Sequence, residues 1–391
     1  MKINKSILAA VLGLSVASAQ ATNVYMSGST AFRSIIYNAL RTPGIVFTAA
    51  PTFTGYGGSG SGDTYMAFQG TLVGGGAVTV KCFWSGSEAG VADVANLNTH
   101  TFIADGALNG ADNAGSPSGA NAETATVNLA MTDTSQASSR TTTPTLTGSK
   151  IGVVTFKWVR NPGVWTGTNV TDQQLRSALT SATPIGLFTG ANDDTSFVYV
   201  SGRDSGSGTR AVALGTCGNG ILTPVQQIQL LNGAMTDVPV GSGNWIGDFG
   251  QSSGGTLAKS LTYNTSAAVD KVNGGAGFSV IAYLGYNDAA TALAGTGGGV
   301  ACTELTLNGV PFSTANIQNG TYNFWNYEYI YKANNVVSGG AGNLDAAYKV
   351  YQRMSVPANI ESATGFDGLA AIKLSQMNAT RPGPAGDPSH N

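Results

Sequence analysis

The sequence predicts an α/β fold, because runs with the character of buried strands alternate with helices that carry clear start signals. The apolar run Ile151–Val159 is long enough for a strand and stops at Asn161-Pro162-Gly163, a strong turn signal. The segment Thr171-Asp172-Gln173-Gln174 has the pattern of a capping box, and Leu175 and Leu179 follow it at helical spacing. No internal repeat is visible, so we expect strands and capped helices packed in layers.

The other expected elements follow from periodicity and turn residues. Ser29 and Thr30 precede a helical apolar stripe made of Phe32, Ile35, Ile36 and Leu40. Thr223-Pro224-Val225-Gln226 predicts a second capping box, with Gly233 as the end of its helix. Strands are expected at Phe278–Tyr283 and Tyr327–Tyr331, helices at Asp345–Met354 and Asp367–Met377, and elaborated Gly-rich loops at 54–77 and 104–121.

The N-terminus has the pattern of a secretory signal peptide. Lys2 and Lys5 precede an apolar run from Ile7 to Val16, and Ala-x-Ala cleavage signals follow near residues 19 and 21. Residues 1–21 are therefore expected to be removed on export. No cysteine follows the apolar run, which argues against a lipid anchor, and no later stretch is apolar enough to span a bilayer. We expect a protein of the periplasm, or one otherwise exported.

Composition excludes some classes of protein. Charged residues make up 10% of the chain and the net charge is −2, so no clustered excess of Lys and Arg predicts a nucleic-acid partner. A hydrophobic content of 42% argues against disorder. With two histidines and no Cys-x-x-Cys motif, neither a metal nor another cofactor is expected.

The three cysteines allow one disulfide in an exported protein. Cys217 and Cys302 both follow glycine-rich turns, and we favour that pair. Cys82 lies in a predicted strand, where a buried free thiol is common.

The segment from Arg203 to Arg210 carries the strongest functional signal. It reads Arg-Asp-Ser-Gly-Ser-Gly-Thr-Arg, after the strand-like run Phe197–Val200 and before an apolar helical run. Ser207 is placed to cap the helix, while Gly208 and Thr209 direct backbone N–H groups outward. Arg203 supplies a planar charged fork, so the segment predicts a socket for an oxyanion. An ordinary serine-rich surface loop remains the alternative.

Several further segments, in the same order, make the chain resemble the substrate-binding proteins of bacterial ABC phosphate importers. These proteins have the type II periplasmic-binding-protein fold, and the resemblance covers most of the chain. The matching segments are 27–32 (Ser-Gly-Ser-Thr-Ala-Phe), 85–91 (Ser-Gly-Ser-Glu-Ala-Gly-Val), 130–133 (Ala-Met-Thr-Asp), 203–209, Trp245 with 250–258, 277–280, and 319–325 with 329–331.

The resemblance implies two lobes joined by two hinge-crossing strands, which close over an anion. The crossings are expected near Val154–Trp158 and Phe324–Ile330. Lobe I would then comprise residues 22–155 and 328–391, and lobe II residues 156–327. The resemblance further implies a monomer that binds inorganic phosphate, delivers it to the membrane subunits of an ABC importer and is not an enzyme.

The same resemblance implies the ligand-binding residues. Thr30, Ala31 and Ser87 would donate hydrogen bonds from lobe I, and Arg203, Ser207, Gly208 and Thr209 from lobe II. Helix N-termini provide such donors with partial positive charge. The alternative for Thr30 and Ser87 is that they only cap their own helices, and for Arg203 that it forms a surface ion pair.

Asp133 would select the ligand. A carboxylate repels an anion unless the anion carries a proton to donate, which monohydrogen phosphate does and sulfate does not. Alternatively, Asp133 caps a turn with Thr134 and Ser135.

Three features depart from the family pattern. Asp204 follows the arginine by one residue instead of two, so its brace on Arg203 is in doubt. Glu88 stands beside Ser87, where it either points to solvent or marks a different ligand. The intervals from Thr30 to Ser87 and from Ser87 to Asp133 are long, which predicts insertions in lobe I.

Other functions are weighed against this one. Gly250-Gln251-Ser252-Ser253-Gly254 matches the Gly-x-Ser-x-Gly pattern of hydrolases, but no strand is expected before it and only His100 or His390 could be the base. The acidic residues Asp193, Asp194 and Asp248 lack the spacing of a calcium loop. A binding protein of this fold for another small oxyanion or solute, and an exported surface or sensing module, stay open.

Overall fold

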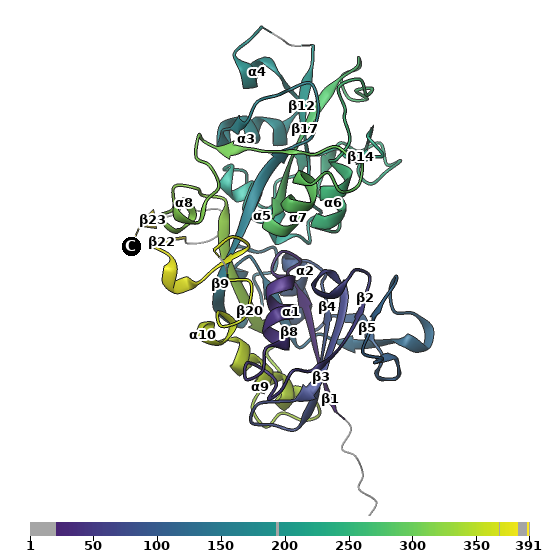
Figure 1. Cartoon of the computed structure of the whole chain (residues 1–391), viewed down its shortest axis with the longest axis vertical. Coiled ribbons are helices and arrows are strands. Elements are labelled where there is room, and N and C mark those ends of the chain that lie inside the picture. The colour runs from purple at the N-terminus through teal and green to yellow at the C-terminus, as the bar shows by residue number, and fades with distance from the viewer. Residues whose placement is uncertain (1–20, 193–194, 367, 382–388, 391) are drawn as a thin grey trace, which may run out of the picture.

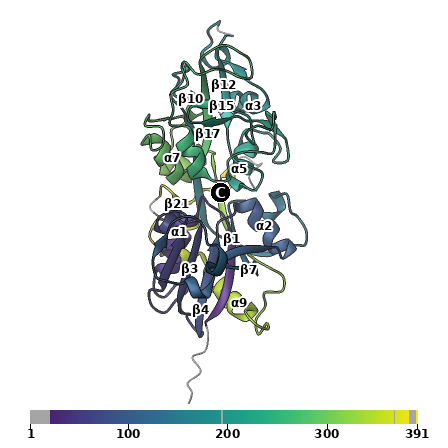
Figure 2. The same ribbon diagram turned by 90° about the vertical axis from the view of Figure 1, so that its right-hand side faces the viewer.

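The structure is a computed structural model that describes residues 21–192, 195–366, 368–381 and 389–390. Two lobes lie along the long axis of the molecule, joined by the long strands β9 (Thr147–Arg160) and β20 (Trp325–Lys332), as Figures 1 and 2 show. The expected two-lobed α/β architecture with two crossing strands is confirmed. Residues 1–20 of the expected signal peptide lie outside the described residues.

Lobe I is built on one sheet whose faces are covered by helices. Its strands run in the order β20-β8-β1-β4-β3-β2-β6, and β1 is parallel to both β4 and β8. The helices α2 and α9 pack on β1, and Ile35, Ile36 and Leu40 of α1 are buried in the same core. The bounds are β1 (Thr22–Gly28), α1 (Arg33–Arg41), β2 (Thr52–Tyr56), β3 (Tyr65–Thr71), β4 (Ala77–Phe83), α2 (Ser87–Asn96), β5 (Thr99–Ile103), β6 (Asp112–Asn113), β7 (Ala122–Thr126), β8 (Leu129–Thr132), α9 (Leu344–Met354), α10 (Pro357–Ile360) and β21 (Ala371–Ile372).

Lobe II has a smaller sheet in the order β11-β12-β17-β9, in which β12 and β17 are parallel. Alternate residues of β12 belong to two separate cores, so helices cover both faces. The bounds are β10 (Asn169–Val170), α3 (Asp172–Thr180), β11 (Thr183–Pro184), α4 (Gly186–Thr189), β12 (Phe197–Ser201), α5 (Gly208–Thr216), β13 (Val225–Gln226), β14 (Gln229–Leu231), β15 (Ala234–Thr236), β16 (Ile246–Gly247), α6 (Gly254–Ser260), β17 (Phe278–Gly285), α7 (Tyr286–Leu293), β18 (Thr303–Glu304), β19 (Thr306–Leu307) and α8 (Thr314–Gln318).

The crossing strands belong to both lobes. Residues 147–155 of β9 pair with β20, whereas residues 156–160 pair with β17 of lobe II. The chain then returns near the hinge after α10, where β22 (Ala379–Thr380) pairs with β23 (Ser389–His390). Arg381 donates hydrogen bonds to the Asn323 carbonyl and to the Thr216 hydroxyl of lobe II. We propose that the lobes are divided at the boundaries expected from the sequence, after residue 155 in β9 and before residue 328 in β20. No helix among the described residues has the length and apolar character needed to cross a membrane.

Most of the expected elements are present, and three expectations are wrong. The capping box at Thr171 forms, with both of its hydrogen bonds. Residues 223–233 form β13 and β14 instead of a helix, because antiparallel pairing with β16 and β15 overrides the local capping signal. Residues 371–376 form β21, paired with β9, and a short 3-10 turn instead of a helix. Residues 54–77 contain most of the β2–β3 hairpin.

The expected disulfide is also wrong, because Cys82, Cys217 and Cys302 are all free and buried. Cys217 follows α5 and packs in the same core as Leu175, whereas Cys302 lies in the other core of lobe II with Ala292. The two cores lie on opposite faces of the sheet, and a disulfide needs Cα atoms within about 7 Å.

Candidate functional site

Three loops meet where the lobes touch, and the first is the turn between β1 and α1. The Ser29 N–H donates to the Met131 carbonyl at 2.7 Å, and the Ser29 hydroxyl accepts from the Phe32 N–H at 3.3 Å. Ser29 therefore closes the turn before α1, whose N-cap is Phe32, and no side chain caps this helix. The Thr30 hydroxyl contacts Arg203 of lobe II instead. Thr30 and Ala31 are half-buried and face the start of α7.

The second loop joins β4 to α2 and lies against the end of β8. Ser87 is the first residue of α2, and its hydroxyl accepts the N–H of Asp133 at 3.2 Å. Both side chains are buried. The Asn326 side chain on β20 donates to the Asp133 carbonyl at 2.8 Å, so the crossing strand fixes the position of this loop.

The third loop lies between β12 and α5 of lobe II. Ser207 is the N-cap of α5, and its hydroxyl accepts from the Arg210 N–H at 3.3 Å. Ser207, Gly208 and Thr209 are all buried. Burial of this first helical turn against lobe I corrects the alternative of a serine-rich surface loop.

Arg203 is 2% exposed, so the alternative of a surface ion pair is wrong. Its Nε donates to the Gln251 carbonyl and its Nη2 to the Ser252 carbonyl, both at 2.9 Å. Its Nη1 lies 3.4 Å from the Thr30 hydroxyl across the lobe boundary. The hydrogen bonds of this guanidinium go to carbonyl and hydroxyl oxygens, so its charge is held between the lobes without a carboxylate in hydrogen-bond contact among the described residues.

The lobes are in direct contact at Gly208 and Gly206. A Cβ on Gly208 would lie 1.5 Å from Asp133 Oδ1 and 2.6 Å from the Ser87 Cβ, so only glycine allows this approach. The Gly206 carbonyl accepts from the N–H groups of Glu88 and Ala89 at 3.0 and 3.2 Å. These bonds join the N-terminus of α2 to lobe II and use two of its free donors.

Asp133 carries a buried carboxylate whose Oδ1 has no hydrogen-bond partner among the described residues. Burial raises the pKa of Asp133 to about 6, against the lowering effect of the Ser87 hydroxyl and the Arg203 charge. A buried carboxylate oxygen without a donor is unfavourable, and its free lone pairs can accept a proton.

The structure corrects the expectation for one neighbouring acid, Glu88, and agrees with the doubt about the other, Asp204. Glu88 does not point to solvent: its oxygens accept from the Thr134 hydroxyl at 2.7 Å and the Arg140 N–H at 2.8 Å. Burial raises the pKa of Glu88 to about 7. Asp204 does not brace Arg203, because its Oδ1 accepts from the Gly206 N–H at 3.1 Å and shapes the loop instead.

Two polar contacts tie the lobes on either side of the loops. Arg140 of lobe I forms a bidentate pair with Asp248 of lobe II, at 3.0 and 3.1 Å, and Arg210 lies 3.2 Å from the same carboxylate. The Asn287 side chain on α7 donates to the Ser34 hydroxyl on α1 at 3.0 Å. These contacts favour the closed arrangement of the lobes.

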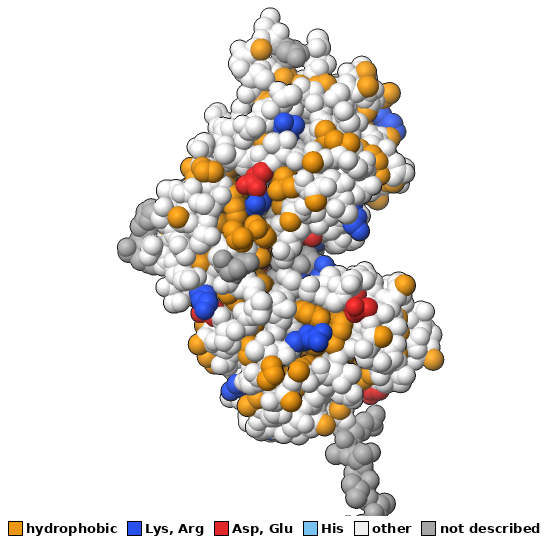
Figure 3. Space-filling model, viewed as in Figure 1, with side chains coloured by type: hydrophobic (Ala, Val, Ile, Leu, Met, Phe, Trp, Pro, Cys, Tyr) orange, Lys and Arg blue, Asp and Glu red, His pale blue; other side chains and the backbone are white. Residues whose placement is uncertain are grey.

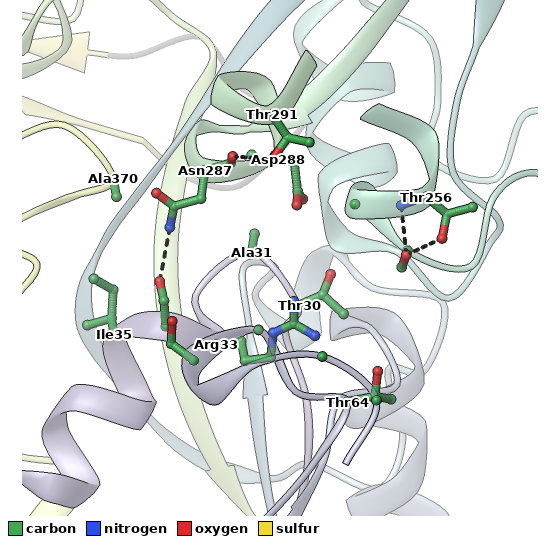
Figure 4. A pocket seen from close by; sticks show the side chains of 18 of the residues that line it. Thr30, Ala31, Arg33, Ile35, Thr64, Thr256, Asn287, Asp288, Thr291 and Ala370 are labelled. Atoms are coloured by element: carbon green, nitrogen blue, oxygen red, sulfur yellow. Dashed lines mark hydrogen bonds between the residues drawn. The ribbon is translucent and has the colours of Figure 1, made fainter. Parts of the chain in front are cut away.

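A cavity of about 620 Å³ opens between the lobes beside these loops. Figure 3 shows the surface hollowed at the waist, with charged side chains at its mouth. Figure 4 shows Thr30 and Ala31 at its centre, with Arg33 below and Asp288 above. Of the eight expected site residues, Thr30 and Ala31 line the cavity. The other six are buried, and Arg203 reaches the cavity lining through its contact with Thr30.

Sequence reasoning missed Arg33, Gln251, Ser252, Asp288 and Glu328. Arg203 is held by the backbone carbonyls of Gln251 and Ser252. Any residue type provides such a carbonyl, so the sequence does not indicate them. Asp288 has a weak signal, since it is an acid in the first turn of α7. Glu328 is a buried acid within an aromatic strand, a pattern that stands out in the sequence.

No family model and no curated protein sequence matches this chain. Solved structures are similar to it at low identity. An ABC-type phosphate transport receptor from Vibrio cholerae is 14% identical, with 83% of this chain and 93% of that chain covered and a TM-score of 0.40. A putative phosphate ABC transporter substrate-binding protein with bound phosphate from Clostridium perfringens is also 14% identical, with 85% and 98% covered and a TM-score of 0.40. A phosphate-binding protein from Stenotrophomonas maltophilia is 14% identical, with 86% and 94% covered and a TM-score of 0.36.

Proposed function

We propose that this chain is an exported solute-binding protein, not an enzyme, that captures phosphate between its lobes for an ABC importer. The observation that carries the proposal is a pair of buried groups at the lobe boundary. Arg203 has no carboxylate in hydrogen-bond contact among the described residues, and its charge acts on Asp133, whose Oδ1 has no hydrogen-bond partner among them. A guanidinium offers planar donors to an oxyanion, and a lone carboxylate oxygen accepts the proton of a monohydrogen phosphate.

Thr30, Ala31 and Ser87 from lobe I, and Ser207, Gly208 and Thr209 from lobe II, would complete the phosphoryl site. Support comes from three of them: Ser87 and Gly208 contact Asp133, and Thr30 contacts Arg203. Hydrogen bonds to a charged group contribute about 1.5–3 kcal/mol each, which is enough in sum to offset the desolvation of the anion. Binding would hold the lobes together in the closed arrangement.

Calorimetric titration of refolded, phosphate-free protein tests the proposal. We expect phosphate to bind with micromolar or tighter affinity and sulfate to bind at least about 100-fold more weakly, because sulfate has no proton for Asp133. Arg203→Ala should weaken phosphate binding by about 2–3 kcal/mol. Equal affinities for phosphate and sulfate would remove Asp133 from its selecting role, and absence of phosphate binding would overturn the proposal.

A different small oxyanion is the second candidate. The N–H groups of Glu88 and Ala89 bond the Gly206 carbonyl, so α2 offers fewer donors to the anion than the resemblance implies. A small panel of carboxylates in the same titration separates the two candidates.

A further inference from the structure

The cavity between the lobes is a compartment of its own, beside the proposed phosphate site. Its volume of about 620 Å³ falls within the range of about 300–1,000 Å³ that is typical of small-molecule sites. Neither Arg203 nor Asp133 lines it. The lining comes from α1 and the β2–β3 loop of lobe I and from α6 and α7 of lobe II, and most of it is Gly, Ser, Thr and Asn. A ligand in this cavity would therefore meet both lobes.

Arg33 presents an underused guanidinium to the cavity from lobe I. It is half-buried at the start of α1 and lines the cavity. Its Nη1 donates to the Asp63 backbone carbonyl at 3.3 Å, and no carboxylate among the described residues lies in hydrogen-bond contact with it. A guanidinium carries five N–H donors, so most of them stay available to a ligand. A carboxylate is a group whose geometry this planar fork matches.

Asp288 presents a carboxylate without a donor from lobe II. It is half-buried on α7, lines the cavity and accepts no hydrogen bond from the described residues. A Cβ on Gly254 would lie 1.9 Å from its Oδ2, so the carboxylate packs closely against the first residue of α6. Burial raises the pKa of Asp288, and the charges of Arg33 and Arg203 oppose that rise. An ammonium would supply both the missing donors and the opposite charge.

The two charged groups face each other across the lobe boundary. The Asn287 side chain donates to the Ser34 hydroxyl at 3.0 Å, and these residues are the chain neighbours of Asp288 and Arg33. Figure 4 shows Arg33 below Ala31 and Asp288 above it. Each charge acts on the other, yet no ion pair joins these two described side chains. A ligand with opposite charges at its two ends would bridge them.

Other kinds of ligand suit this lining less well. A simple anion would be repelled by Asp288, and a simple cation by Arg33 and by the exposed Lys259, which also lines the cavity. An apolar molecule would leave the guanidinium and the carboxylate without partners. The many hydroxyl and amide groups of the lining favour a small polar body between the two charged ends.

We propose that the interlobe cavity binds a small polar α-amino acid as its zwitterion, with the carboxylate at Arg33 and the ammonium at Asp288. This is a second ligand site, and it goes beyond the proposed phosphate function without depending on it. Because the two ends of the ligand are held by different lobes, binding would favour the closed arrangement.

Calorimetric titration of the refolded, phosphate-free full chain with L-serine and two matched fragments tests the inference. The fragment 3-hydroxypropionate lacks the ammonium group of serine, and ethanolamine lacks its carboxylate. We expect L-serine to bind at least about tenfold more tightly than either fragment, because only serine meets both charged groups. The fragments are measured by competition with L-serine.

Variants of the two charged residues should act on opposite ends of the ligand. Arg33→Gln should weaken L-serine about tenfold and change the Kd of ethanolamine less than about twofold. Asp288→Asn should weaken L-serine about tenfold and change 3-hydroxypropionate less than about twofold. Asp345→Asn is the control, because Asp345 pairs with Lys349 on α9 and does not line the cavity; it should change none of these affinities.

The outcomes separate this inference from the proposed function. Absence of L-serine binding, or binding no tighter than that of the fragments, overturns the inference whether or not phosphate binds. Serine binding that neither charge-removing variant weakens also overturns it, because the amino acid then lies elsewhere. L-serine binding with the expected variant pattern, in a chain that does not bind phosphate, supports the inference and overturns the proposed function alone.

Discussion

Asp133→Asn is expected to stabilise the ligand-free protein at neutral pH while it weakens the selection of phosphate. The wild-type carboxylate is buried, and its Oδ1 has no hydrogen-bond donor among the described residues. Ionisation of such a group is unfavourable until a ligand supplies the missing proton. Asparagine keeps the shape of the side chain and removes the charge.

The magnitude follows from the raised pKa. Burial raises the pKa of Asp133 from 3.8 to about 6, and a difference of one in pKa corresponds to about 1.4 kcal/mol. The folded state binds the proton more tightly than the unfolded state does. Its contribution to stability is therefore complete below about pH 4 and is lost as the pH rises through about 6, a loss of about 3 kcal/mol in total.

Urea denaturation of phosphate-free protein between pH 4 and pH 8 measures this effect. The difference in free energy of unfolding between Asp133→Asn and wild type should grow with pH in favour of the variant, and level off near pH 7. Asp345→Asn serves as the control, because Lys349 and the Gly339 N–H lower the pKa of that exposed carboxyl, so its effect should be small and opposite. Parallel curves for wild type and Asp133→Asn would refute the reasoning.

Three other predictions follow from the lobe contacts and the cysteines. Gly208→Ala places a methyl group where Asp133 Oδ1 lies, so it should hold the lobes apart. We expect the affinity for phosphate, measured by calorimetry, to fall at least about tenfold, while the free energy of unfolding, measured by denaturation, stays nearly unchanged. Arg140→Gln breaks the partly exposed pair with Asp248 and leaves the Arg210–Asp248 contact of lobe II in place. A contribution of about 0.5–1 kcal/mol predicts a Kd for phosphate about two- to fivefold higher in the same titration, and an unchanged Kd would show that closure does not depend on the pair. Alkylation of the unfolded chain without reductant should label all three cysteines by mass spectrometry, since they are free, and a single label would contradict the structure.

The sequence correctly predicted elements that depend on interactions between residues close together in the chain. The capping box at Thr171, the apolar stripe of α1 and the glycine-rich entry to α5 each depend on residues within one or two turns. The segment at 223–233 has equally good local signals, yet it pairs with strands that lie farther along the chain. Such pairing between distant segments competes with local propensity. It produces no periodic pattern in the sequence from which it could be predicted.

The candidate site was predictable where the side chain itself is the signal. Arg203 and Asp133 stand out because charged residues are rare in this chain. What holds Arg203 was not predictable, since the carbonyls of Gln251 and Ser252 come from backbone that any residue provides. The burial of Glu88 depends in the same way on Thr134 and on the backbone of Arg140, which only the folded loop brings near.

The lobe boundary gathers polar groups that the fold alone does not satisfy. Glu328 follows the β20–β8 register to a place beside Asp133, and burial, together with the Asp133 charge, raises its pKa well above the ordinary value. Its Oε1 has no partner among the described residues, while Ser29 donates to its other oxygen. A folded core normally pairs such atoms, because each unpaired one lowers stability by about 1–3 kcal/mol. The two unpartnered oxygens of Asp133 and Glu328 lie close together, and a proton-bearing oxyanion bound beside Asp133, as we propose, would supply a donor that the folded chain lacks there.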